Sequence, residues 1–138
     1  MLTVYLDVDG VLRGCASPTE DIENFLWFCL DNCYCYWLTS YCRGGVNYAV
    51  SKIGNISQKL RFELEARVQP TDWRFSKSEA IDRSEDYVWF DDNAPFDMVG
   101  QLKGYGPSGE HFYWVNSSDP ESAKKMLAYL KERISKEE

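Results

Sequence analysis

Acidic and hydroxyl side chains follow three short apolar runs of this chain, and together they could bind a charged group and do chemistry on it. The three groups are Asp7-Val8-Asp9-Gly10, Thr39-Ser40 and Asp91-Asp92. If the apolar runs are parallel strands, the groups share one edge of a sheet, because ligands of open parallel sheets bind at the carboxyl ends of the strands. Carboxylates at short range repel one another, a cost that a bound cation usually offsets. An all-oxygen site of this kind suits Mg²⁺.

The spacing of Asp7 and Asp9 suits a nucleophile and a proton carrier. On an extended strand, residues two apart point the same way. One carboxylate could then attack while its neighbour, just past the strand end, handles a proton. Gly10 permits a sharp backbone turn that a bulkier residue would oppose. Acids are common at loop starts, so the pattern gains its weight from following an apolar run at the N-terminus.

The elements that must position these residues alternate between strands and helices. Strands are predicted at 2–6, 33–38, 87–90 and 110–116, and helices at 19–31, 44–53, 77–83 and from 119 onwards. Apolar residues in 56–69 show both the alternation of a strand and the four-residue repeat of a helix. We expect a helix that gives way to a short strand near Val68. Continuous apolar strands alternating with helices predict an α/β protein with a mainly parallel sheet, covered on both faces. One domain over residues 1–138 is expected.

Three of the helix starts are predicted from local residue chemistry. Residues 17–20, Ser-Pro-Thr-Glu, carry N-cap and first-turn chemistry. The pair Gly44-Gly45 could open the second helix, and Gly54-Asn55 is its expected stop. Asp119 is the expected N-cap of the C-terminal helix, with Pro120 in its first position.

Composition and targeting signals favour an ordinary cytoplasmic protein. The 138 residues are 44% hydrophobic and 27% charged, and we find neither a membrane-length apolar run nor a signal-peptide pattern. The five cysteines are therefore interpreted as reduced thiols. Cys29, Cys33 and Cys35 lie close together, but the single histidine, His111, is distant, so buried thiols are favoured over a zinc site. The sequence does not predict the oligomeric state.

The charge of the chain is distributed unevenly. The net charge of −7 argues against a generally basic nucleic-acid-binding surface. Residues 43–83, however, hold eight basic and five acidic side chains, a local charge of +3 against −10 for the remainder. Two interpretations stay open: a mixed, solvated face, or a basic lip beside an anion site.

Four ordered patterns in the chain resemble the motifs of the haloacid dehalogenase superfamily of phosphohydrolases. They are Asp7-Val8-Asp9-Gly10-Val11, Tyr36-Trp37-Leu38-Thr39, Lys77 before Ser78-Glu79-Ala80-Ile81, and Val88-Trp89-Phe90-Asp91-Asp92. The resemblance covers residues 2 to about 97. It implies a three-layer αβα, Rossmann-like fold. It also implies a Mg²⁺-dependent phosphatase with a phosphorylated substrate.

The resemblance implies that Asp7 is the nucleophile and forms an aspartyl-phosphate. Asp91 and the backbone carbonyl of Asp9 would share the Mg²⁺ with Asp7, and Asp92 would support the metal or orient Lys77. Asp9 would protonate the leaving group and then activate the hydrolytic water. Lys77 would neutralise charge between the nucleophile and the phosphoryl group, which suits a reaction that depends on positioning and electrostatics.

The candidate substrate contacts are Gly10, Thr39, Ser40 and Arg43. The resemblance implies that Thr39 hydrogen-bonds a phosphate oxygen. Thr39 and Ser40 could instead be an ordinary cap, and Lys77 a surface lysine. Asp97 is interpreted as a solvated acid rather than as support for the metal ligands.

The spacing of the motifs leaves no room for the cap domain that many superfamily members carry. Neither residues 10–18 nor residues 70–77 can hold one, so the site is expected to be open to large substrates. Trp37-Leu38-Thr39-Ser40-Tyr41 is similar to the second motif of a capless subgroup predicted to work in RNA repair, which typically reads Trp-Leu-Thr-Thr-Trp. The substrate could accordingly be a small molecule or a nucleic-acid end.

Two other functional classes use the same residues. A non-catalytic phosphate-binding or regulatory domain would usually have lost an acid from the first or fourth motif, and none is lost here. A receiver-like domain would carry its phosphorylated Asp after the third strand and its acid pair after the first, whereas Asp91-Asp92 comes late in this chain.

Overall fold

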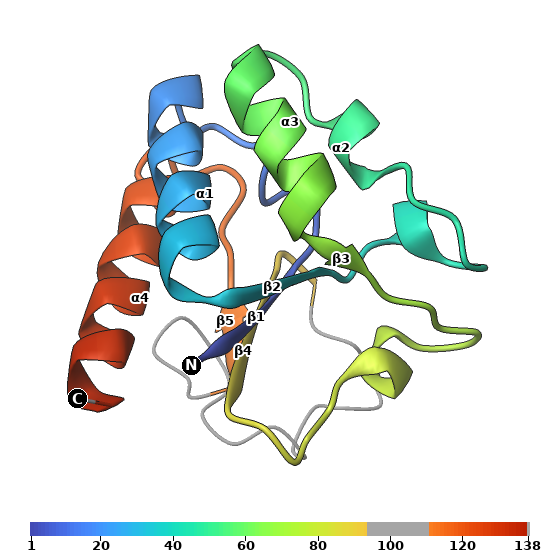
Figure 1. The fold of residues 1–138 in the computed structure, drawn as a ribbon. Coiled ribbons are helices and arrows are strands. Elements are labelled where there is room, and N and C mark those ends of the chain that lie inside the picture. The colour runs from blue at the N-terminus through green and yellow to red at the C-terminus, as the bar shows by residue number, and fades with distance from the viewer. Residues whose placement is uncertain (94–110, 138) are drawn as a thin grey trace.

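The computed structural model describes residues 1–93 and 111–137, and these build an α/β fold around one parallel sheet (Figure 1). The five strands are β1 (Thr3–Leu6), β2 (Tyr34–Trp37), β3 (Gln69–Pro70), β4 (Tyr87–Asp91) and β5 (Phe112–Trp114). Their order is β3-β2-β1-β4-β5, and every pairing is parallel. The predicted α/β class and parallel sheet are confirmed.

The longer helices cover one face of this sheet. The helices are α1 (Thr19–Asn32), α2 (Ala49–Lys52), α3 (Gln58–Arg67) and α4 (Ser122–Glu137), with 3₁₀ helices η1 (Ser40–Cys42) and η2 (Lys77–Ala80). Helix α1 packs against both α3 and α4 on the same side of the sheet (Figure 1). Strand side chains such as Val4, Trp37 and Phe90 form the main core beneath these helices.

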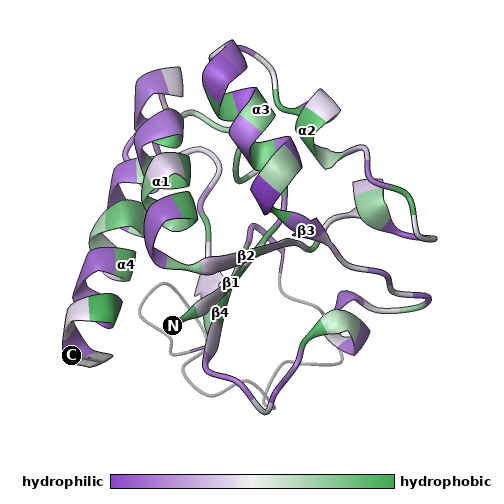
Figure 2. Ribbon diagram, in the orientation of Figure 1, coloured by the Kyte–Doolittle hydropathy of each residue, from purple (hydrophilic) through white to green (hydrophobic). Residues whose placement is uncertain are grey.

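The opposite face of the sheet carries a smaller core. Because strand side chains alternate between faces, Tyr5 and Trp89 point away from the main core and pack with Phe112 and with Ile81, which directly follows η2. Elements thus lie on both faces, which gives the three-layer, Rossmann-like arrangement expected from the sequence. In Figure 2, hydrophobic colour lies on parts of β1 and β4 and alternates with hydrophilic colour along α1 and α4, while β2 is pale.

The structure corrects three predicted helices. Gly44 and Gly45 have φ values of 84° and 82°, in the left-handed region, so a right-handed helix cannot begin there and α2 is limited to Ala49–Lys52. The helix expected over 77–83 is the 3₁₀ helix Lys77–Ala80. The C-terminal helix begins at Ser122, because a turn precedes it in which the carbonyl of Asp119 accepts from the Ser122 N–H.

The start of α1 also differs from the expected cap. Its N-cap is Pro18, and no side chain caps it. The hydroxyl of Ser17 instead accepts a hydrogen bond from the N–H of Ala123 in the first turn of α4 (2.9 Å) and lies 2.8 Å from the hydroxyl of Ser122. A residue expected to start one helix therefore caps another.

The uncertain stretch at 56–69 follows its predicted course. Helix α3 begins after Ser57, whose hydroxyl accepts from the N–H of Leu60, and β3 follows from Gln69. Within the described ranges, we find no helix with the length and apolar character needed to cross a membrane.

Candidate active site

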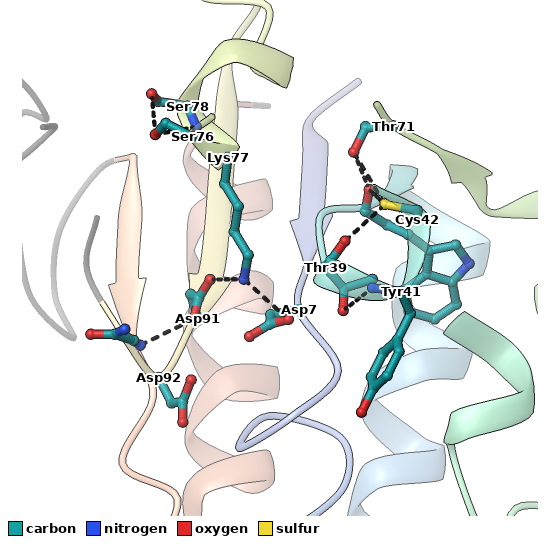
Figure 3. Close-up of polar contacts among 12 residues, drawn as sticks. Asp7, Thr39, Tyr41, Cys42, Thr71, Ser76, Lys77, Ser78, Asp91 and Asp92 are labelled. Carbon is teal, nitrogen blue, oxygen red and sulfur yellow. Dashed lines mark hydrogen bonds and ion pairs between the residues drawn. The ribbon is translucent and has the colours of Figure 1, made fainter. Parts of the chain in front are cut away.

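The carboxyl ends of β1, β2 and β4 bring the predicted groups to one edge of the sheet. In the strand register, Leu6 of β1 lies opposite both Trp37 of β2 and Phe90 of β4. The residues that follow these three positions therefore lie side by side at the carboxyl edge of the sheet. Figure 3 shows Asp7 between Asp91 on one side and Thr39 on the other.

Three carboxylates form an acidic group at this edge. Asp7, Asp91 and Asp92 each offer an oxygen, and these oxygens lie within 4.8 Å of one another. Asp7 and Asp91 are buried, with exposed fractions of 6% and 1%. In residues 1–93 and 111–137 this is the sole cluster of three or more acidic, histidine or cysteine side chains that could hold a metal ion. Its donors are all oxygens, the set that hard divalent cations prefer.

Lys77 reaches this acidic group from η2. Its Nζ lies 2.8 Å from Oδ2 of Asp91 and 3.2 Å from Oδ1 of Asp7 (Figure 3). A capping box between Ser76 and Glu79 holds the start of η2, and the carboxylate of Glu79 also accepts hydrogen bonds from the backbone N–H groups of Arg74 and Phe75. The interpretation of Lys77 as an ordinary surface lysine is therefore wrong.

Burial and mutual repulsion perturb the ionisation of the carboxylates. Burial, together with the neighbouring Asp7, raises the pKa of Asp91 to about 8, although Lys77 opposes the shift. Burial likewise raises the pKa of Asp7 against the opposing effect of Lys77. Burial alone would lower the pKa of Lys77, but the charges of Asp91 and Asp7 outweigh it and the pKa is raised. Without a further cation, the acidic group is incompletely ionised near neutral pH.

These shifts predict an unusual pH dependence of stability in the metal-free protein. A carboxyl whose folded-state pKa is raised stabilises the fold while it is protonated and loses that contribution as pH rises through the folded value. We expect the free energy of unfolding in EDTA to fall between about pH 5 and about pH 8.5, and Mg²⁺ to stabilise most at the alkaline end. Urea unfolding at several pH values, with EDTA or Mg²⁺, measures both effects.

Asp91→Asn is the matched variant for this prediction, because it removes the strongly shifted group and keeps the shape of the side chain. Its stability in EDTA should change less with pH than that of the wild type. A wild-type stability that rises over this interval in EDTA would contradict the raised pKa of Asp91.

Gly10 allows Asp92 to approach the acidic group. Its φ of +79° lies in the left-handed region, as the predicted sharp turn requires. A Cβ at this position would lie 2.0 Å from Oδ2 of Asp92, far inside van der Waals contact. Gly10 is thus needed both for the turn and for the space that the Asp92 carboxylate fills.

The carboxylate of Asp9 is not part of the acidic group. The hydroxyl of Tyr41 donates to its Oδ2 (2.8 Å), and Nε of Arg13 lies 3.4 Å from its Oδ1. The backbone around Asp9 turns back tightly, with the N–H of Gly10 donating to the carbonyl of Arg13 (2.7 Å). Its predicted metal contact, through the backbone carbonyl, stays a prediction.

Thr39 and Ser40 follow β2, and Thr39 does act as a cap. Thr39 is 1% exposed and is the N-cap of η1, with its Oγ1 accepting from the N–H of Tyr41 (3.4 Å). Its side chain faces the carboxyl edge beside Asp7, so the cap and the predicted phosphate contact involve the same hydroxyl (Figure 3). Ser40 is exposed as the first residue of η1.

Arg43 joins the end of η1 to the loop that precedes η2. Its guanidinium donates to the carbonyl of Arg74 and lies over the ring of Trp73, 4.7 Å from the centroid. Arg74 in turn lies over the ring of Phe75, which is 80% exposed. These residues, Arg43 and Trp73 to Phe75, form a cationic and aromatic cluster, here called the rim, that ends two positions before Lys77.

Sequence reasoning missed the partners that hold the candidate catalytic groups. Glu79 had a usable signal, because Ser76 and Glu79 have the Ser-x-x-Glu spacing of a capping box. Tyr41 and Arg13 had none, since their contact with Asp9 depends on how two separate loops fold. Asp97 lies outside the described residues.

Comparisons of the chain with protein-family models, with curated proteins and with solved structures found no match.

Proposed function

We propose that the protein is a Mg²⁺-dependent phosphomonoester hydrolase of the haloacid dehalogenase type, with Asp7 as its nucleophile. The observation that carries the proposal is the bridge of Lys77 between Asp7 and Asp91, beside Asp92 at the carboxyl edge of a parallel sheet. A nucleophilic carboxylate, a fixed cation and an all-oxygen acidic group are the parts that phosphoryl transfer needs.

The acidic group fits a divalent cation. Asp7, Asp91 and Asp92 would hold Mg²⁺, because their oxygens already converge and because burial and the neighbouring Asp7 disfavour the charged form of Asp91 unless a cation is present. When bound, the cation would neutralise the carboxylates and the phosphate oxygens. A basic residue in place of Asp92 or Asp91 would remove this capacity.

The residues of the chain would divide the reaction into two steps. Asp7 attacks phosphorus as the bond from phosphorus to the leaving oxygen breaks, and Asp9 gives its proton to that oxygen. A water then attacks the phosphoryl group on Asp7, and Asp9 takes the proton of that water as phosphate leaves. Thr39 would hydrogen-bond a phosphate oxygen, and Lys77 would balance charge between nucleophile and phosphoryl group.

The test is phosphate release from p-nitrophenyl phosphate with Mg²⁺ and with EDTA. Release that needs Mg²⁺ and is lost in Asp7→Asn would support the reaction class. The alternative is a non-catalytic phosphate-binding domain, in which Tyr41 and Arg13 would hold Asp9 without any proton transfer. Without phosphate release, Mg²⁺-dependent trapping of beryllofluoride would indicate a competent Asp7 that needs a larger substrate, and its absence would favour that alternative.

The surroundings of the site support a nucleic-acid end as substrate. Residues 7–18 after β1 and 71–76 after β3 carry no additional domain, so this part of the edge has no cap. The rim formed by Arg43 and Trp73 to Phe75 combines positive charge with an exposed ring, the combination that single-stranded nucleic acids bind. The local charge of +3 over residues 43–83 also favours binding of a negatively charged nucleic acid.

We therefore expect 3′- or 5′-phosphorylated oligonucleotides to be hydrolysed with a higher kcat/KM than sugar phosphates. Phe75→Ala should lower kcat/KM for the oligonucleotide about tenfold, because stacking on an aromatic ring stabilises each base by about 1–3 kcal/mol. Hydrolysis of a sugar phosphate should not change. Phe62→Ala, which removes a 70% exposed ring from α3, is the matched control. Equal losses on both substrates would refute the role of the rim.

A further inference from the structure

Tyr41 and Arg13 fix the carboxylate of Asp9 from two sides. The Tyr41 hydroxyl donates to Oδ2 of Asp9 (2.8 Å), and the Arg13 guanidinium is paired with Oδ1 (3.4 Å). The two oxygens of Asp9 therefore have different partners, and rotation of the carboxylate would break both contacts. The hydrogen bond to Asp9 raises the pKa of Tyr41, so its hydroxyl keeps the proton that it donates.

Tyr41 is itself held by several contacts. Its backbone N–H donates to Oγ1 of Thr39 (3.4 Å), and its carbonyl accepts from the N–H of Tyr48 (3.0 Å). The ammonium of Lys52 lies 5.5 Å from the centroid of its ring. Tyr41 thus connects the end of β2, where Thr39 lies, to the loop after β1, where Asp9 lies.

These contacts are poorly placed to stabilise the fold. The side chains of Arg13 and Asp9 are 45% and 57% exposed, and exposed ion pairs contribute little to stability because solvent screens them. Their effect is on the orientation of one carboxylate beside the nucleophile. General acid–base catalysis depends on such placement, since the proton carrier must lie within hydrogen-bond reach of the reacting oxygen.

We propose that Tyr41 is a positioning residue that orients Asp9 for proton transfer to the leaving group. The inference rests on the proposed phosphatase function and adds a residue that the resemblance does not supply. At this position the similar capless subgroup typically has Trp, whose donor is the indole N–H and not a hydroxyl. Tyr41 acts through Asp9 and need not touch the substrate.

The test compares wild type and Tyr41→Phe on two leaving groups. An alkyl alcohol leaves only when protonated, whereas p-nitrophenolate leaves readily without a proton. We expect Tyr41→Phe to lower kcat/KM for an alkyl phosphate about tenfold and to have a much smaller effect on p-nitrophenyl phosphate. Tyr48→Phe is the matched control, because it removes the hydroxyl of a 58% exposed tyrosine in the same loop region and should leave both values unchanged.

The double variant Asp9→Asn/Tyr41→Phe tests whether Tyr41 acts through Asp9. We expect Tyr41→Phe to have no further effect on kcat/KM for the alkyl phosphate once Asp9 is replaced, since residues that act as a unit are not additive. Equal losses on both leaving groups, or a full additional loss in the Asp9→Asn background, would overturn the proposal while the phosphatase function stood. A wild type that releases no phosphate with Mg²⁺ would overturn both.

Discussion

Asp7→Asn is expected to reduce Mg²⁺-dependent phosphate release by at least about 10³-fold, the order of loss that follows removal of a catalytic nucleophile. The amide keeps the shape of the side chain but cannot form an acyl-phosphate. It also removes one of two buried carboxylates that repel each other, so the variant should fold. Phosphate release and thermal unfolding, measured on the same preparations, separate loss of chemistry from loss of structure.

Asp31→Asn is a suitable control for this experiment. Asp31 lies at the end of α1 with a 65% exposed side chain, 4.0 Å from Arg67, and its replacement should leave activity unchanged. An Asp7→Asn protein that is folded and still releases phosphate at the wild-type rate would show that the nucleophile is another group. Asp91 would then be the first residue to test, because it lies within the same acidic group.

The parts of the molecule that local sequence determines were predicted well. Continuous apolar runs predicted β1 and β4, which are buried on both faces, and also β2, although Tyr34 is exposed and Tyr36 is half-buried there. The ends of those strands then placed Asp7, Thr39 and Asp91 at one edge, since in a parallel sheet all carboxyl ends lie together. To predict that these residues lie close together, it was enough to know that the strands are parallel, and no knowledge of side-chain packing was needed.

The parts that depend on contacts between distant segments were not predicted. Asp9 was expected to lie with the other acids, but its carboxylate is paired with Tyr41, 32 positions further along the chain. Ser17 caps a helix that begins 105 positions after it. The helix expected from Gly44 failed for a local reason, because φ values above 80° belong to a turn. Spacing alone does not distinguish a glycine that starts a helix from one in a left-handed turn.

Lys77→Met should separate two roles of Lys77, which are to balance the charge of Asp7 and Asp91 and to take part in phosphoryl transfer. Methionine keeps most of the length of the side chain but leaves Asp7 and Asp91 adjacent without their cation. Removal of one partner of a buried ion pair typically costs about 3–5 kcal/mol of stability. Without Lys77, which lowers both pKa values, the carboxyls should titrate at still higher pH. The stability gap between wild type and variant in EDTA should therefore widen as pH rises from about 5 to about 8.5.

Mg²⁺ should restore much of this stability but little activity. A bound divalent cation can neutralise the two carboxylates, whereas the contact of Lys77 with the phosphoryl group would stay lost, at a cost of about 10²–10³-fold in kcat. Lys59→Met, which replaces an exposed lysine of α3, is the matched control for both measurements. If Mg²⁺ restored activity and stability together in Lys77→Met, the role of Lys77 would be confined to balancing the charge of the carboxylates. Restored stability with activity still lost would instead place the ammonium group of Lys77 in the transition state for phosphoryl transfer.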